Sequence, residues 1–101
     1  MISITAIIVA KPGHADTVRG ALLDVAAYVD ANEADTVSFY LARDLDNDHM
    51  FTTYERFTSI EARDAHNSSP ATQAFFGAVK DLIETPVILQ SCEEFSERRP
   101  A

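Results

Sequence analysis

His66 is the side chain of this sequence best suited to acid–base chemistry, because the unperturbed pKa of histidine lies close to neutrality. On a continuous helix it shares a face with Ala62 and Arg63, which places it either over a sheet or at a rim beside a cation. Two interpretations stay open. His66 is a catalytic base whose active form is the neutral imidazole, or it is a packed histidine whose ring nitrogens are satisfied by neighbours.

Aromatic residues occur in the segments around His66. The ring of Tyr54 either places its hydroxyl against a substrate oxygen or is simply buried, and the buried ring is the simpler interpretation. Phe39, Phe75 and Phe76 are candidates for lining an aromatic pocket, although aromatic residues at this spacing usually form core. We therefore take His66 and Tyr54 as candidate catalytic residues, and the three phenylalanines as candidate substrate-binding residues.

The other histidine and acidic residues do not form a metal-binding pattern. The 3 histidines lack ligand spacing such as a helical pair four residues apart. The segment from Asp44 to Glu55 imitates a calcium loop, but His49 stands where glycine is needed. A Gly-rich phosphate loop and a serine nucleophile elbow are also absent from the sequence. We expect neither a metal nor a phosphate-loop chemistry.

Composition excludes several classes of partner. The 101 residues are 47% hydrophobic, which fits one domain over residues 1–101. The net charge of -8 repels phosphate backbones and anionic lipid heads, so we expect neither nucleic acid nor membrane as a partner. A single cysteine, Cys92, excludes an internal disulfide and favours the cytoplasm. The apolar stretch from Ile2 to Ala10 is too short to span a membrane.

The segment Met50–Phe57 is rich in aromatic and β-branched residues and therefore predicts a strand. Thr58 and Glu61 follow it in capping-box spacing, which predicts that a helix begins there. Within the strand, Glu55 and Arg56 face opposite ways, so Arg56 is expected to pair across a subunit or a sheet edge. A second helix start is predicted at Ser69-Pro70, because Ser is a good N-cap and Pro fits the first helical position.

Hydrophobic periodicity predicts the other elements. A helix from about Asp16 to Ala31 is indicated by an apolar stripe at three- and four-residue steps: Val18, Leu22, Val25 and Val29. The helix after Pro70 carries a second stripe of Phe75, Phe76, Val79, Leu82 and Ile83, and Thr85-Pro86 is expected to end it. The remaining predictions are a strand at Ile2–Ala10, a turn at Lys11–Gly13, a strand at Thr36–Arg43 with Val37, Phe39 and Leu41 on one face, a hairpin loop at Asp44–His49, a strand at Val87–Cys92 and a charged tail from Glu93 to Ala101.

This order of elements, β-α-β-β-α-β, predicts an α+β, ferredoxin-like fold with a four-stranded antiparallel sheet and helices on one face. The opposite face carries Thr5, Ile7 and Val9, which are nearly as apolar as the residues between them. A sheet with water on one side shows cleaner alternation of apolar and polar residues. We therefore expect a homodimer joined through the sheet faces.

Several segments together resemble the antibiotic biosynthesis monooxygenase family, whose small quinol-monooxygenase-like members are dimeric α/β-barrels. The resemblance covers Ile2 to about Phe95 and is carried by Lys11-Pro12-Gly13, Phe39 to Asp44, Tyr54 to Phe57, Ala65-His66, Ser69-Pro70 and Phe75. The chain departs from the common pattern at Ala34-Asp35, where many members have Pro-Gly, at Phe57, where they have Trp, and at Ala71, where they have a second His. The absence of any Trp disfavours the haem-degrading branch.

The resemblance implies an oxygenase without metal or flavin. An electron-rich aromatic quinol or anthrone is deprotonated, with His66 as the natural base, and the anion reacts with O2 in an apolar pocket. Two alternatives stay open. One is an isomerase-like enzyme that uses the same pocket for proton transfer without O2, and the other is a non-catalytic dimeric module that binds a small ligand.

Overall fold

The computed structural model describes residues 1–96 and residue 98, and these form four strands and three helices. Positions 97 and 99–101 of the predicted domain and charged tail lie outside the described residues. The elements are β1 (Ile2–Val9), α1 (Ala15–Asn32), β2 (Thr36–Arg43), β3 (Met50–Phe57), α2 (Ile60–Asn67), α3 (Pro70–Val79) and β4 (Ile88–Glu93).

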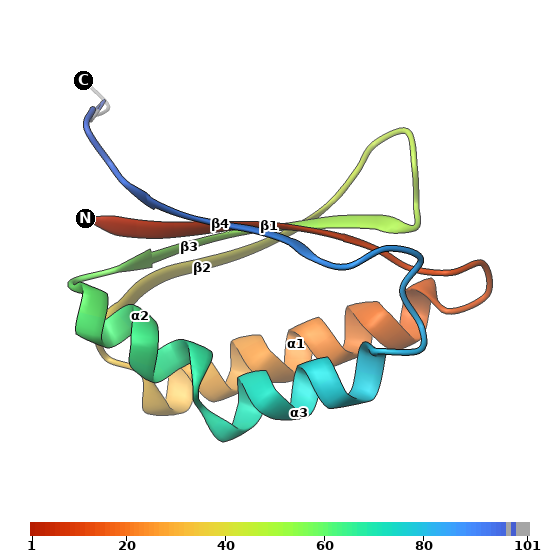
Figure 1. Cartoon of the computed structure of the whole chain (residues 1–101), viewed down its shortest axis with the longest axis horizontal. Coiled ribbons are helices and arrows are strands. Elements are labelled where there is room, and N and C mark those ends of the chain that lie inside the picture. The colour runs from red at the N-terminus through yellow and green to blue at the C-terminus, as the bar shows by residue number, and fades with distance from the viewer. Residues whose placement is uncertain (97, 99–101) are drawn as a thin grey trace.

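The strands form one antiparallel sheet in the order β2-β3-β1-β4. All three helices cover the same face of this sheet, and α1 and α3 lie side by side against it (Figure 1). The arrangement confirms the predicted α+β, ferredoxin-like fold with helices on one face. Residues of β1 and β3 that point toward the helices therefore belong to a buried layer, and those between them face away from it.

The core lies between the sheet and the helices. All four residues of the predicted stripe on α1 are buried there, beneath Ile8 of β1. Phe51 of β3 and Val79 of α3 close the same cluster from two sides. Burial of an apolar stripe rather than helix propensity holds a helix of this kind in place. The stripe on α1 is Val18, Leu22, Val25 and Val29.

The helix starts differ in one detail from the prediction. Ser69 caps α3 as predicted, since its hydroxyl accepts a hydrogen bond from the Thr72 amide and Pro70 occupies the first turn. At α2 the cap is Ser59 rather than Thr58, and its hydroxyl accepts from the Ala62 amide at 3.1 Å. The predicted capping box with Glu61 was therefore wrong by one residue, because adjacent hydroxyl residues compete for the same role.

The prediction that the last helix continues through Ile83 was also wrong, because α3 ends at Val79. The Leu82 amide donates to the Val79 carbonyl at 2.8 Å, so the chain turns instead of continuing the helix. Ile83 then forms an isolated bridge with Ala10 at the end of β1. The apolar stripe continues in sequence because these residues still pack against the core.

A register shift in β2 corrects a third expectation. The pairing with β3 is irregular between Thr36 and Ser38, so Val37 leaves the expected alternation and is 50% exposed. Phe39 and Leu41 keep their predicted places against the core. The last strand runs from Ile88 to Glu93, one residue later than predicted at each end.

The helices are too short or too polar to cross a bilayer. Over the described part of the chain, none combines the length and hydropathy of a membrane span. Cys92, on β4, is exposed and carries a free thiol.

Candidate active site

His66 lies over the sheet rather than at its rim. It occupies the last turn of α2 and is only 5% exposed. Its ring contacts two aromatic rings of the sheet, with centroid distances of 5.6 Å to Phe39 and 5.4 Å to Phe57. Because the ring is buried, its nitrogens need partners within the protein.

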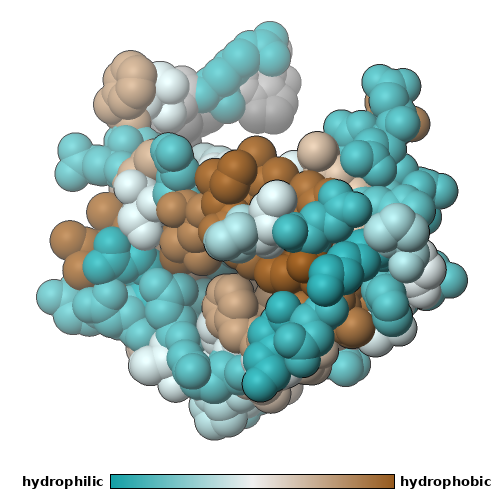
Figure 2. Space-filling model, turned by 45° about the vertical axis from the view of Figure 1, so that its right-hand side comes forward, coloured by the Kyte–Doolittle hydropathy of each residue, from teal (hydrophilic) through white to brown (hydrophobic). Residues whose placement is uncertain are grey.

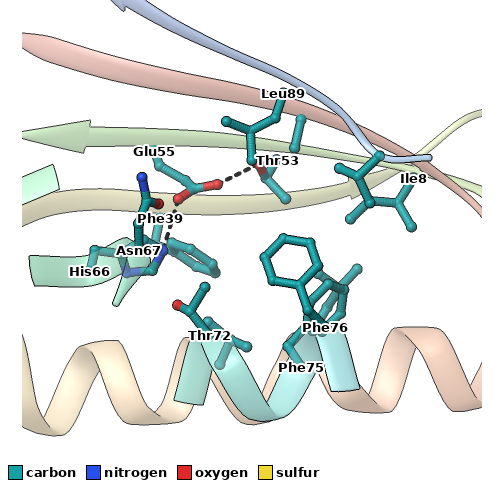
Figure 3. A pocket seen from close by; sticks show the side chains of 14 residues that line it. Ile8, Phe39, Thr53, Glu55, His66, Asn67, Thr72, Phe75, Phe76 and Leu89 are labelled. Carbon is teal, nitrogen blue, oxygen red and sulfur yellow. Dashed lines mark hydrogen bonds and ion pairs between the residues drawn. The ribbon is translucent and has the colours of Figure 1, made fainter. Parts of the chain in front are cut away.

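Both nitrogens of His66 meet a carboxylate. Nδ1 lies 2.7 Å from Oε1 of Glu33, which caps the C-terminal end of α1. Nε2 lies 3.0 Å from Oε1 of Glu55 on β3, and this pair is drawn in Figure 3. The consecutive elements β3 and α2, together with the end of α1, which is distant from them in sequence, thus bring a single imidazole between two acidic side chains.

A hydroxyl group holds each carboxylate in turn. Oγ1 of Thr36 donates to Oε1 of Glu33 at 2.8 Å, and Oγ1 of Thr53 donates to Oε2 of Glu55 at 2.7 Å. Thr53 and Glu55 are both buried. These bonds orient the carboxylates toward the ring and satisfy oxygens that would otherwise be costly to bury.

The two carboxylates determine the charge of the ring. Burial lowers the pKa of His66, but the hydrogen bonds to Glu55 and Glu33 and the charges of both groups outweigh burial. The pKa of His66 is therefore raised above its usual 6.5. The negative end of the α2 dipole, in whose last turn the ring sits, also favours a positive charge. A carboxylate oxygen at each ring nitrogen thus favours the imidazolium, in which both nitrogens donate, over the neutral imidazole that the unperturbed pKa of histidine led us to expect.

Sequence reasoning named neither Glu33 nor Glu55 as a site residue. The signal for Glu55 was the alternation of β3, in which it shares a face with Phe51 and Phe57, both buried in the core layer. An acidic residue on such a face needs a buried partner. Glu33 lies in a polar break after a helix, and nothing in its neighbourhood in sequence pointed to His66.

A mostly apolar pocket opens beside Glu55 and His66. The polar groups facing it come from these two residues and from Thr53, Asn67 and Thr72 (Figure 3). The three candidate substrate-binding residues, Phe39, Phe75 and Phe76, all line it. The other lining residues are Ala6, Ile8, Leu22, Val25, Val87 and Leu89. The structure thus brings four of the five sequence-predicted site residues to one pocket.

Half-exposed apolar side chains border this pocket. Phe76 of α3 is 38% exposed and Leu89 of β4 is 45% exposed. On the face shown in Figure 2, hydrophobic side chains gather in the middle and hydrophilic ones surround them. The free volume of the pocket is about 40 Å³, which is less than the roughly 150 Å³ that holds a benzene ring. Side chains at the border must move before an aromatic molecule can enter.

Tyr54 is the predicted site residue that lies elsewhere. It follows Thr53 on β3 and so faces away from the helices, on the opposite side of the sheet from His66. Its hydroxyl donates to Oε2 of Glu94, and this bond raises the pKa of Tyr54. Arg56 donates to the same carboxylate, from Nη2 to Oε1 at 2.9 Å, and together these partners lower the pKa of Glu94 to about 2. Arg56 thus pairs with a residue that follows β4 in the same chain.

The described residues offer no obvious metal site. Among residues 1–96 and 98, no group of three or more His, Cys, Asp and Glu side chains has an arrangement that could hold a metal ion. The cluster around His66 has just one imidazole and two carboxylates, and its nitrogens already have partners.

Comparison with protein families gives one match, and it covers most of the chain. The family described as antibiotic biosynthesis monooxygenase matches residues 1–78. That range contains every residue of the His66 cluster and both phenylalanines of α3. No curated protein matches the sequence.

Solved structures share the fold. A Deinococcus radiodurans protein, named as a candidate antibiotic biosynthesis monooxygenase, has 20% identity and a TM-score of 0.88 over 100% of this chain and 99% of its own. A Mycobacterium tuberculosis protein has 21% identity and a TM-score of 0.89, covering 97% and 98%. A third, from Caulobacter crescentus and named like the first, has 21% identity and a TM-score of 0.87, covering 94% and 90%. Likeness at this identity shows the fold alone.

Proposed function

The chain belongs to the antibiotic biosynthesis monooxygenase family, and we propose that it is a cofactor-independent monooxygenase of an aromatic quinol, anthrone or related electron-rich small molecule. Family membership and the names of its structural neighbours support a general monooxygenase-like function. The observation that carries the finer proposal is the Glu55–His66 pair, at 3.0 Å, beside an aromatic pocket.

The first step is loss of a proton from the substrate hydroxyl. Glu55 is the group that accepts it, because its carboxylate faces the pocket and the raised pKa of His66 favours the protonated ring, which cannot accept a proton. A carboxylate alone is a weak base for this purpose. Its usual pKa is about 4.3, whereas a phenol such as that of tyrosine has a pKa of about 10. The product anion must therefore be stabilised by the site.

His66 supplies that stabilisation. When the proton moves from substrate to Glu55, one negative charge moves from the carboxylate to the substrate oxygen. The imidazolium stays beside both groups, and its attraction for an anion is strong in a pocket with few polar neighbours. His66 is thus an electrostatic partner of the base, and Glu33 keeps its far nitrogen hydrogen-bonded at 2.7 Å.

The second step is reaction of the anion with O2. The substrate itself supplies two electrons, and Glu55 returns its proton to the oxygen adduct, which then loses water that carries one oxygen atom and two protons of the substrate, while the other oxygen atom stays in the product. The apolar walls formed by Phe39, Phe75 and Phe76 orient an aromatic ring and limit the water around the anion. Because the resting pocket has a volume of only about 40 Å³, binding requires Phe76 or Leu89 to swing outward.

Oxygen uptake with a panel of quinols and anthrones tests this function. We expect uptake that depends on the protein, exceeds spontaneous oxidation and needs no added metal or flavin. Proton exchange or double-bond migration without uptake would instead support the isomerase-like alternative. Tight ligand binding without any turnover would support a non-catalytic binding module. Treatment with a chelator should change neither activity nor melting temperature.

We also propose that the chain forms a homodimer through the sheet faces, in the cytoplasm. Support comes from the sheet face without helices, where Tyr40, the register partner of Tyr54, is 66% exposed and Ile7 is partly exposed. An apolar sheet face of this kind is a liability in a monomer. Light scattering at micromolar concentration should give twice the mass of the chain, and a monomer would contradict the proposal.

A further inference from the structure

A second cavity reaches His66 from its Nδ1 side. Its volume is about 240 Å³, and its walls come from the end of α1, the start of β2 and the helix α2. Glu33 and Asp35 line it, together with Ala62 and Ala65. Of the residues that the structure describes, His66 alone lines both this cavity and the substrate pocket. The imidazole therefore stands between two separate spaces, with Glu55 on one side and Glu33 on the other.

The charged groups that face His66 come from two elements. Glu33 approaches from the end of α1 and Glu55 from β3. The ring's other neighbours are the aromatic rings of Phe39 and Phe57 on the sheet. Thr72 of α3 lines the substrate pocket, and Ser69, the N-cap of α3, lines the second cavity; their hydroxyls bond to each other at 3.1 Å. On α2 itself, Arg63 and Asp64 pair with one another at 2.8 Å.

The two carboxylate oxygens of Glu33 differ in their hydrogen-bond partners. Its Oε1 accepts from Thr36 and meets Nδ1 of His66, whereas its Oε2 is buried and accepts no hydrogen bond from the described protein groups. A buried anionic oxygen is costly unless it is hydrogen-bonded. The cavity of about 240 Å³, which Glu33 lines, has ample room for water near the Glu33–His66 pair.

We propose that Glu33 is a positioning residue that fixes His66 in its doubly protonated form, and that the second cavity lets the Glu33–His66 pair exchange protons with solvent while substrate fills the pocket. This inference rests on the proposed function of the Glu55–His66 pair. Nδ1–H of the imidazolium is the bond that breaks in this exchange, with Oε1 of Glu33 as the acceptor and water as the next one. The reverse transfer restores the imidazolium. Substrate in the pocket does not block this route, because it runs on the other side of the ring.

Glu33→Gln tests the positioning role with little change in shape. The amide oxygen still accepts from Thr36 and from Nδ1–H, but the negative charge is gone. We expect the pKa of His66, followed by NMR titration of its ring, to fall by about one to two pH units. The pH above which the rate of oxygen uptake falls should decrease by the same amount. Asp35→Asn is the matched control, since Asp35 lines the same cavity without bonding to His66, and it should move neither value.

Titration of His66 needs no turnover, so the two proposals can fail separately. An unchanged His66 pKa in Glu33→Gln would overturn the role of Glu33, whether or not the protein consumes oxygen. A lowered pKa without any oxygen uptake would overturn the proposed function instead. A lowered pKa of His66 without a change in the pH above which oxygen uptake falls would show that the Glu33–His66 pair does not act in the reaction. If Glu33→Gln does not fold, the NMR spectrum of the ring nitrogens of His66 in the wild-type protein provides the test. A spectrum with only one protonated ring nitrogen at neutral pH would contradict the proposal.

Ala62→Leu tests the second cavity. The larger side chain fills space on the Nδ1 side of the ring and leaves both carboxylates in place. We expect slower exchange of the His66 Nδ1 proton with water and an unchanged His66 pKa. An unchanged exchange rate would overturn the role of the cavity.

Discussion

Nε2 of His66 lies 3.0 Å from Oε1 of Glu55, and both side chains are at least nine-tenths buried beside the same apolar pocket. The contact joins the end of α2 to the middle of β3. It favours the charged imidazole, so that in our proposal the carboxylate is the group that accepts a proton from a bound molecule. This division of roles differs from a neutral histidine acting alone, and it leads to distinct experimental outcomes.

Glu55→Gln should lower kcat by roughly 10²- to 10⁴-fold, because the amide keeps the shape of the side chain but cannot accept the substrate proton. Glu61→Gln is the matched control, since Glu61 is an exposed carboxylate on α2 and should leave kcat unchanged. Oxygen uptake and circular dichroism on the same preparations separate lost chemistry from lost fold. Full activity of Glu55→Gln would exclude Glu55 as the base.

His66→Ala should destabilise the fold by about 3–5 kcal/mol, because two buried carboxylates lose their shared partner. This exceeds the loss for a packed histidine of about 1–3 kcal/mol from a cavity and unpaired polar atoms. The His66→Ala substitution should destabilise the Glu33→Gln, Glu55→Gln double variant by much less. Urea unfolding of the four proteins gives the coupling energy. Equal costs in both backgrounds would show that charge pairing contributes nothing.

Much of the fold was predictable from local patterns. The stripe on α1 and the boundaries of β2 and β3 follow from hydrophobic period and turn residues, and these signals lie within a few residues of each other. The end of α3 was not predictable in this way. Leu82 and Ile83 continue its apolar period, but they pack against the end of β1, a contact that only the tertiary structure shows. The exposure of Val37 depends likewise on pairing with a distant strand.

The site was predicted in part for the same reason. His66 and the three phenylalanines stand out by residue type, and the structure brings all four to the pocket. Glu33 acts through a contact with a residue distant in sequence, so no local pattern marks it. Tyr54 shows the limit of residue type as a guide, because alternation along β3 turns it to the other face.

The free energy of unfolding should fall as pH rises above about 6.5. The folded pKa of His66 is raised above its unfolded value, so its contribution is fully present below 6.5 and is lost as pH rises through the folded pKa. Urea unfolding at a series of pH values measures this slope. The Glu33→Gln, Glu55→Gln double variant should lose most of it. A wild-type stability that rises across this range would contradict the raised pKa.

Tyr54→Phe should leave kcat within about twofold of wild type, because Tyr54 lies across the sheet from the pocket and bonds to Glu94. Steady-state oxygen uptake measures the effect. Arg56 keeps its own bonds to Glu94, so the segment after β4 stays attached to the sheet in this variant. A decrease in kcat of tenfold or more would instead identify Tyr54 as a catalytic residue.

The pH dependence of kcat for oxygen uptake, corrected for spontaneous oxidation, tests the roles of Glu55 and His66 most directly. We predict activity that holds through neutrality and falls at alkaline pH as His66 loses its proton. Activity that instead rises through a single ionisation near neutrality and stays high at alkaline pH would identify neutral imidazole as the active form. That result would contradict the proposal that Glu55 is the base and His66 its charged partner.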